Sequence, residues 1–143
     1  PIAQAAGIAV VIAGDTRVAG RVGADGIHVE GNRAVVKEAV ERFHPKLSVG
    51  VGGAKTRDDA LELGEEQPDY IFFGKFGFDN KPEAHPRNRT RGLGGAEMSQ
   101  GPVIVMAGSD IESVAAVAAT GAGFVAMSSA LFGDGANRAV ARA

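Results

Sequence analysis

Short apolar runs alternate with amphipathic segments along the whole chain. The amphipathic segments, residues 32–43, 56–66 and 109–121, place their apolar residues at helical spacing. The apolar runs are rich in valine and isoleucine and lack polar alternation, which is typical of strands buried on both faces of a parallel sheet. They cover residues 8–13, 26–30, 47–51, 70–74, 103–107 and 124–128. The alternation therefore predicts an α/β protein with six parallel strands, built from right-handed βα units.

Two of the expected helices open with residues in capping-box spacing. Thr56 precedes Asp59, and Ser109 precedes Glu112. In each pair the two side chains can satisfy backbone N–H groups of the first helical turn. We therefore expect helices to begin directly after Thr56 and Ser109.

Composition narrows the class of protein further. The length of 143 residues and a hydrophobic content of 45% predict one domain over residues 1–143 with a substantial core. A net charge of −2 gives no broad electrostatic reason to bind nucleic acid or an anionic membrane, and the lack of cysteine excludes a disulfide framework. The apolar runs are far shorter than the roughly 20 residues that a membrane-spanning helix needs. We expect a soluble, cytoplasmic protein, and a homo-oligomer is compatible with this composition.

Glycine and small polar residues gather where the expected strands end. The segments there read AGDTR, HVEGNR, GVGGAKT, FGKFGFDNK, MAGSD and MSSALFG. Open α/β sheets and α/β barrels place their chemistry at the carboxyl ends of strands, and glycine lets a ligand approach the backbone. The pattern therefore indicates a ligand site along this edge of the sheet.

Four segments resemble, in order, the motifs of the thiamine phosphate synthase and thiazole tautomerase family. They are GADGIHVEG, DYIFFGKFGFDNK, PVIVMAGSDIESV and GAGFVAMSSALF, and the similarity runs from Ile8 to Phe132. The resemblance implies a TIM (β/α)₈ barrel in which the six strands are the third to the eighth. The chain begins with Pro1, and we expect the first two βα units to be missing or supplied by a partner, since six strands leave two unpaired edges. An open doubly wound sheet is the alternative.

The resemblance also implies a Mg²⁺ site. The family joins a pyrimidine diphosphate to a thiazole phosphate and releases pyrophosphate with the help of Mg²⁺. Asp15 matches the first metal-binding aspartate, whereas Asn32 and Arg33 replace the second and leave Glu30 as the nearest carboxylate. Arg33 is then expected beside the metal. Asp15 has an alternative role as the N-cap of the following helix.

The phosphate end of the family's site is better preserved. The resemblance places the thiazole phosphate on the loops after the last two strands, at Gly108, Ser109, Ser128 and Ser129, where many barrels bind phosphate with backbone N–H groups. Ser109 has the alternative role of helix cap, and Asp110 would repel an anion.

Four further positions carry expectations from the same resemblance. Lys81 roughly matches the pyrophosphate-binding lysine, and Gly53 stands where the family has a serine that touches the pyrophosphate. Lys75 stands where synthases have proline and tautomerases have a proton-shuttling histidine, so it could act as acid or base only if buried. His28 is expected to be a hydrogen-bonded histidine lining the barrel.

The segment 81–91, KPEAHPRNRTR, is a proline-punctuated basic loop after a strand end. A lid over the site is one interpretation, and a solvated surface insertion is the other and is favoured for the arginines. RNA binding is disfavoured because no aromatic residue is interleaved for base stacking. Its basic residues are Lys81, His85, Arg87, Arg89 and Arg91.

Taken together, these residues favour a thiamine phosphate synthase that acts on small phosphorylated substrates. One alternative is a thiazole tautomerase-like enzyme that works without Mg²⁺. Another, from a different class, is a non-catalytic phosphate-binding barrel of the same family.

Overall fold

A curved sheet of six parallel strands organises the molecule. The computed structural model describes residues 2–75, 81–87 and 101–132. The strands follow one another across the sheet in chain order, and every neighbouring pair is parallel. They are β1 Val11–Ala13, β2 Gly26–Glu30, β3 Ser48–Gly52, β4 Tyr70–Phe73, β5 Val103–Met106 and β6 Phe124–Ala126. The predicted parallel strands are confirmed.

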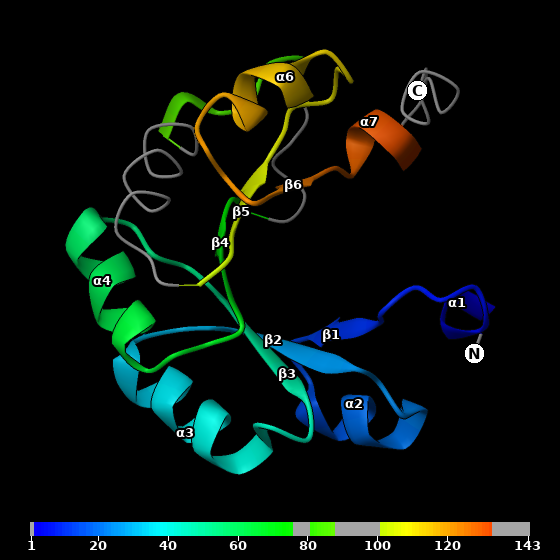
Figure 1. The fold of residues 1–143 in the computed structure, drawn as a ribbon, viewed down its shortest axis with the longest axis vertical. Helices are drawn as coiled ribbons and strands as arrows, with labels where there is room; N and C mark the ends of the chain where they lie inside the picture. The colour runs from blue at the N-terminus through cyan, green and yellow to red at the C-terminus, as the bar shows by residue number, and fades with distance from the viewer. Residues whose placement is uncertain (1, 76–80, 88–100, 133–143) are drawn as a thin grey trace.

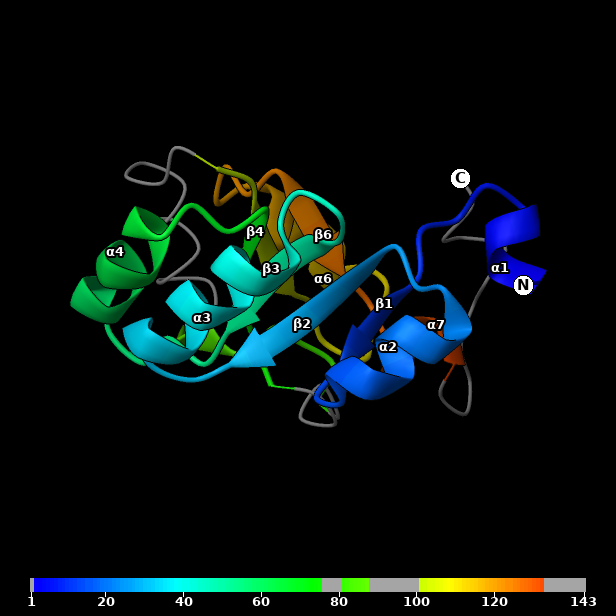
Figure 2. The ribbon, with the colours of Figure 1, turned by 90° about the horizontal axis from the view of Figure 1, so that it is seen from below.

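The helices of the described residues are α1 Ile2–Ala5, α2 Thr16–Val22, α3 Arg33–Phe43, α4 Arg57–Glu65, α6 Ser113–Ala118 and α7 Ser129–Phe132. Four of them, α2, α3, α4 and α6, each lie between two consecutive strands, and α1 and α7 flank the first and the last strand. The sheet curls into an incomplete barrel, with α3 and α4 on its outside (Figure 1). Figure 2, seen from below, shows α3 and α2 on either side of β2, which lies in view between them. This is the βα arrangement that the hydrophobic pattern predicts.

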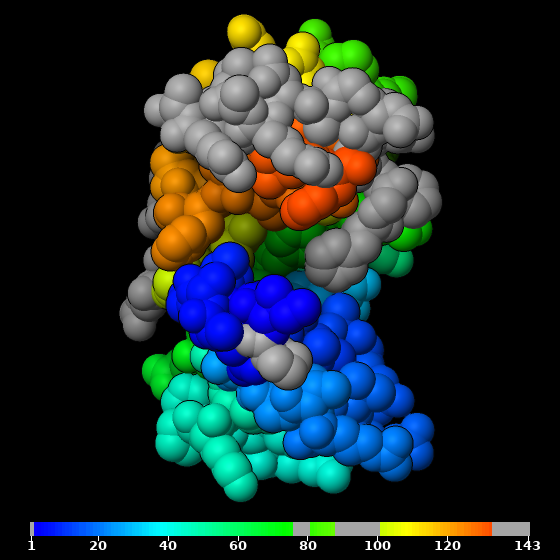
Figure 3. Space-filling view, turned by 90° about the vertical axis from the view of Figure 1, so that its right-hand side faces the viewer, coloured from blue at the N-terminus to red at the C-terminus, as the bar shows by residue number. Residues whose placement is uncertain are grey.

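The two outer strands are shorter and more exposed than the four inner ones. The sequence pattern predicts strands over residues 8–13 and 124–128, but β1 has three residues and so does β6. Val11 is 39% exposed and Phe124 is 60% exposed. Among the described strands, β1 pairs only with β2, and β6 pairs only with β5. In Figure 3 α1 and α7 both face the viewer on this open side of the molecule.

The capping predictions have different outcomes. The Thr56–Asp59 box forms, with the Asp59 N–H donating to Thr56 Oγ1 at 3.1 Å and the Thr56 N–H donating to Asp59 Oδ2 at 3.0 Å. The box expected at Ser109 is wrong, because α6 begins at Ser113 and makes no side-chain capping bond at Glu112. Ser113 Oγ instead accepts the Gly108 N–H at 2.9 Å.

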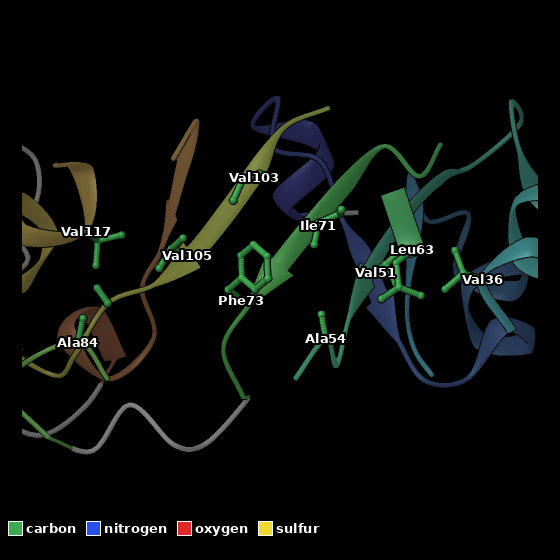
Figure 4. Packing of buried hydrophobic residues seen from close by; sticks show 11 residues of the cluster. Val36, Val51, Ala54, Leu63, Ile71, Phe73, Ala84, Val103, Val105 and Val117 are labelled. Atoms are coloured by element: carbon green, nitrogen blue, oxygen red, sulfur yellow. The ribbon is translucent and has the colours of Figure 1, made fainter. Parts of the chain in front are cut away.

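The apolar core lies between the strands and the helices in two clusters. The smaller cluster joins Ala19 of α2 and Ala39 of α3 to Ile27 and Val49 of the sheet. The larger one runs along the outer side from α3 to α6. Its members include Val36, Val51, Leu63, Ile71, Phe73, Val105 and Val117, and Figure 4 draws them. The strand members of the clusters, such as Val51 and Phe73, point to the outer side of the sheet. Since successive side chains of a strand point to opposite faces, the residues between them face the inner side.

No helix within the described ranges is both long and apolar enough to span a membrane.

Candidate functional site

The carboxyl ends of all six strands meet at one edge of the sheet, because the strands are parallel. The loop after β1 leaves beside β2, with the Gly14 N–H donating to the His28 carbonyl at 3.2 Å. At the other end, the Ala107 N–H donates to the Ala126 carbonyl at 2.9 Å, so the loops after β5 and β6 also leave side by side. The structure therefore brings the candidate residues to one edge in two groups.

Asp15 caps a helix. Its Oδ1 accepts the Arg17 N–H at 2.9 Å and the Val18 N–H at 3.4 Å, and the Arg17 Nε lies 3.5 Å away. A carboxylate at this position satisfies N–H groups of the first turn that have no intrahelical partner. The capping role considered for Asp15 is thus present, and any contact with a metal ion would be made in addition to it.

Arg33 forms ion pairs with the end of a neighbouring helix. Its Nε lies 2.5 Å from Glu66 Oε1, and its Nη1 lies 2.9 Å from Glu65 Oε2. The hydrogen bond to Glu66, with help from the charge of Glu65, raises the pKa of the Arg33 guanidinium above its ordinary value. Arg33 is expected beside the metal, and in the structure its guanidinium pairs with the two carboxylates at the end of α4. Asn32 caps α3 by accepting the Val35 N–H at 3.2 Å.

His28 is a buried residue on the inner side of the sheet, as expected. Its side chain is 4% exposed, and its Nδ1 lies 2.9 Å from the hydroxyl oxygen of Tyr70. Its Nε2 lies 3.8 Å from Glu30 Oε1. Burial lowers the pKa of the His28 imidazole, and the negative charge of Glu30 opposes part of that change. Burial also raises the pKa of the Tyr70 phenol, so its O–H remains protonated.

Sequence reasoning missed Tyr70 and the two glycines that surround this histidine. His28, Gly50 and Tyr70 lie in one row across β2, β3 and β4, and Glu30 and Gly52 form the next row. A side chain at Gly50 would overlap the Tyr70 ring. The available signal is the spacing of two in SVGVG together with the one tyrosine of the chain, in DYIFF. Cross-strand register, which the sequence does not give, decides that they meet.

The loop after β5 already has backbone partners in the segment that follows β4. The Ser109 N–H donates to the Lys81 carbonyl at 2.7 Å, and the Asp110 N–H donates to the Pro82 carbonyl at 3.1 Å. A Cβ added at Gly108 would lie 2.5 Å from the Glu83 carbonyl carbon. The structure therefore brings Lys81 and Ser109 together through their backbones.

The loop after β6 continues into α7 at Ser129. The Ser128 carbonyl accepts the Leu131 and Phe132 N–H groups at 3.0 and 2.9 Å. Ser128 and Ser129 thus belong to the first turn of a short helix that starts at the same edge as Gly108 and Ser109.

The remaining candidates lie on the surface. Lys75 and Lys81 are both exposed, so Lys75 lacks the buried setting that acid–base chemistry would need. Gly53 has φ of +89°, and a Cβ there would contact Glu30 at 3.6 Å. In the loop, His85 Nδ1 accepts the Arg87 N–H at 3.2 Å. Arg89 and Arg91 lie outside the described residues.

A metal site made by protein alone is absent from the part of the chain that the structure describes. There, no three His, Asp or Glu side chains come together as a possible metal cluster. Asp15 and Glu30 offer carboxylate oxygens from neighbouring strand ends, and such oxygens suit a hard cation that takes its other ligands from substrate phosphates and water.

Comparisons with known proteins agree on one family. The family model described as thiamine monophosphate synthase matches residues 1–131. The thiamine-phosphate synthase of Hyphomonas neptunium is 29% identical over 92% of this chain and 60% of its own length. That of Rhodospirillum centenum is 29% identical over 99% of this chain and 69% of its own length. The chain thus spans about 60% of the Hyphomonas relative.

Solved structures share the fold. The thiamine phosphate pyrophosphorylase from Pyrococcus furiosus superposes with a TM-score of 0.73 at 20% identity, over 96% of this chain and 66% of that one. The YdjI aldolase from Escherichia coli superposes with a TM-score of 0.66 at 17% identity, over 90% of this chain and 56% of that one. Proteins that differ in their named activity therefore share this architecture, and the architecture alone does not specify the chemistry.

Proposed function

Because this chain belongs to the thiamine monophosphate synthase family, we propose that it acts in a thiamine phosphate synthase. The reaction joins hydroxymethylpyrimidine diphosphate to thiazole phosphate and releases pyrophosphate. The observation that carries this proposal is the family match over residues 1–131. The sheet of parallel strands, with its candidate residues at one edge, supports it.

The part of the site that binds Mg²⁺ and pyrophosphate would lie at the carboxyl ends of β1 and β2. Asp15 and Glu30 would hold Mg²⁺ through carboxylate oxygens, with phosphate oxygens of the substrate completing the coordination. When bound, Mg²⁺ neutralises charge that develops on the departing pyrophosphate. Lys81 would add an ammonium group to the same task. Glu30 is 48% exposed, so its carboxylate is accessible to a ligand.

The phosphate end of the site would lie at the carboxyl ends of β5 and β6. Backbone N–H groups of Gly108, Ser109, Ser128 and Ser129 are the candidates for holding the thiazole phosphate. The Gly108 and Ser109 N–H groups donate to Ser113 Oγ and to the Lys81 carbonyl in this structure. An anion bound by these donors would therefore have to replace Ser113 Oγ at Gly108 and the Lys81 carbonyl at Ser109.

One observation favours a second candidate. Arg33 occupies the position of the family's second metal-binding aspartate and pairs with Glu65 and Glu66. A site with one carboxylate fewer suits a relative that handles a thiazole phosphate without Mg²⁺, either as a tautomerase-like enzyme or as a non-catalytic binding protein.

Pyrophosphate release tests the proposal directly. The full-length protein is incubated with both substrates, with Mg²⁺ or with a chelator, and pyrophosphate is measured over time. Mg²⁺-dependent release that requires both substrates supports the synthase. Conversion of a thiazole carboxylate phosphate without Mg²⁺ would favour the tautomerase, and phosphate binding without either conversion would favour the binding protein.

A further inference from the structure

Tyr70 holds the buried imidazole of His28 from across a neighbouring strand. The Tyr70 side chain starts on β4 and passes over Gly50 of β3, where any Cβ would overlap its ring. Its hydroxyl oxygen reaches His28 Nδ1 at 2.9 Å, and the two rings stack with centroids 5.7 Å apart at 19°. Phe72 packs edge-on against the same imidazole at 5.7 Å and 84°. The orientation of the His28 ring is therefore fixed by two aromatic neighbours and one hydrogen bond.

The other ring nitrogen faces the carboxylate at the edge of the sheet. His28 Nε2 lies 3.8 Å from Glu30 Oε1, and the two side chains are 4% and 48% exposed. Gly52 leaves the space for this approach. A Cβ at Gly52 would lie 2.9 Å from Nε2 and 3.1 Å from Oε1, closer than ordinary contacts allow.

We propose that His28 is a positioning residue, which Tyr70 holds so that the Nε2–H of the ring faces the carboxylate of Glu30 and stabilises it electrostatically. The direction follows from the donors and acceptors available. Nε2 and Oε1 are 3.8 Å apart, beyond direct hydrogen-bond distance, so the carboxylate acts through its charge, which favours an N–H over a lone pair facing it. Nε2 then carries the proton of the neutral ring. Nδ1 then accepts, and the Tyr70 O–H donates to it. Tyr70, His28 and Glu30 form one directed chain from the inner side of the sheet to its carboxyl edge.

The inference rests on the proposed function in one respect. It assigns Glu30 to the ligand site because Glu30 would hold Mg²⁺ there. The position of the proton on His28 does not depend on that assignment, so it can be tested by itself.

Two-bond ¹H–¹⁵N correlation spectra of the histidine rings, recorded at neutral pH, test the directed chain. The protein has three histidines, and His44 and His85 serve as references in the same spectra. We expect the proton of the neutral His28 ring on Nε2, with Nδ1 unprotonated and accepting the Tyr70 O–H. Tyr70→Phe keeps the ring but removes the donor, and it should introduce the Nδ1–H tautomer. A protonated Nδ1 in the wild type would overturn the proposal.

Gly52→Ala tests the contact with Glu30 while leaving both polar side chains in place. The added methyl group should separate Nε2 from Oε1 and shift the Nε2 resonance, and Glu30→Gln should shift it without any change in volume. Gly20→Ala is the matched control, because nothing lies within 4 Å of a Cβ at that helical position. Unchanged His28 resonances in both Gly52→Ala and Glu30→Gln would overturn the proposal.

Kinetics of the full-length protein extend the test to the ligand site. Glu30→Gln and Gly52→Ala should each raise the half-saturating Mg²⁺ concentration by about threefold or more, with a smaller change in kcat, and Gly20→Ala should not. A shift in Glu30→Gln without one in Gly52→Ala would show that His28 does not position Glu30. If the wild type releases no pyrophosphate, the proposed function fails, and the spectra still decide the role of His28.

Discussion

The two ends of the candidate site differ in the kind of polar group that they present and in the partners of those groups. At the carboxyl ends of β1 and β2, charged side chains interact with other side chains or cap helices, as Asp15, Glu30 and Arg33 do. At the carboxyl end of β5, small residues use backbone N–H groups, and the acceptors at Ser109 and Asp110 are carbonyls of residues 81–82. The first end is therefore sensitive to changes of charge and side-chain shape, and the second to movement of one loop.

This difference bears on how each end could bind a ligand. Glu30 is half exposed, and its Oε1 lies 3.8 Å from Nε2 of the buried His28, so under our proposal it would receive a cation without a change in the backbone. The N–H groups of Ser109 and Asp110 can receive an anion only after residues 81–82 leave. Binding at the second end is thus coupled to a loop that also carries Lys81.

The largest effect that we predict concerns Gly50 at the first end. In Gly50→Ala the new methyl group overlaps the Tyr70 ring, so Tyr70 must turn away and lose its bond to His28. We expect the free energy of unfolding to fall by about 3 kcal/mol, because overpacking and a lost buried partner add together. Urea denaturation measures it.

Two variants check the cause of that loss. Gly20→Ala should be neutral or stabilise by up to about 1 kcal/mol, since alanine is the better helix former. Tyr70→Ala should make the Gly50→Ala change much less costly, because the clash is then gone. Additive losses in the double variant would contradict the packing account.

The next effect concerns Gly108 at the second end. A Cβ there would lie 2.5 Å from the Glu83 carbonyl carbon, so the clash is with backbone rather than with the tip of a side chain. Gly108→Ala should displace the loop of residues 81–84 and cost about 2 kcal/mol. Amide hydrogen exchange at Ser109 and Asp110 should accelerate, whereas His28 should give unchanged ring resonances. Protection of Ser109 at the wild-type level would contradict the prediction.

The sheet could be predicted from the sequence more fully than the site. β2 to β5 are buried runs such as GIHV and VIVM, and parallel pairing follows from their alternation with helices. The edge strands came out shorter, since exposed Val11 and Phe124 have one neighbouring strand each among the described elements. At the site, the capping of α2 by Asp15 follows from local sequence. The meeting of Tyr70 with His28 depends on register across three strands, which no local pattern gives.

A third prediction uses pH to separate the two ends. The pKa of His28 is lowered in the folded protein by burial, from an ordinary value of 6.5. The folded state then binds fewer protons than the unfolded state, so this stabilisation is fully present above about pH 6.5 and is lost as the pH falls below it. Hydrogen exchange on acidification, corrected for its intrinsic rate, should accelerate first in β2 and β3 and not at Ser109. His28→Gln should abolish this earlier acceleration of exchange in β2 and β3. If the acceleration persists in His28→Gln, protonation of His28 is not its cause.

The smallest effect concerns the ion pairs that Arg33 makes with Glu65 and Glu66. Arg33→Gln removes a charge that pairs with Glu65 and Glu66 at 2.9 and 2.5 Å, but the arginine side chain is 51% exposed. Salt screens such pairs, so the loss of stability should be small at low salt and smaller still at high salt. Glu66→Gln should cost a similar amount, and the double variant should cost less than the sum. Arg33→Asp should cost more, because it places a third carboxylate beside Glu65 and Glu66. If Arg33→Asp instead leaves the stability unchanged and strengthens Mg²⁺ binding, the side chain at position 33 faces the ligand site rather than α4.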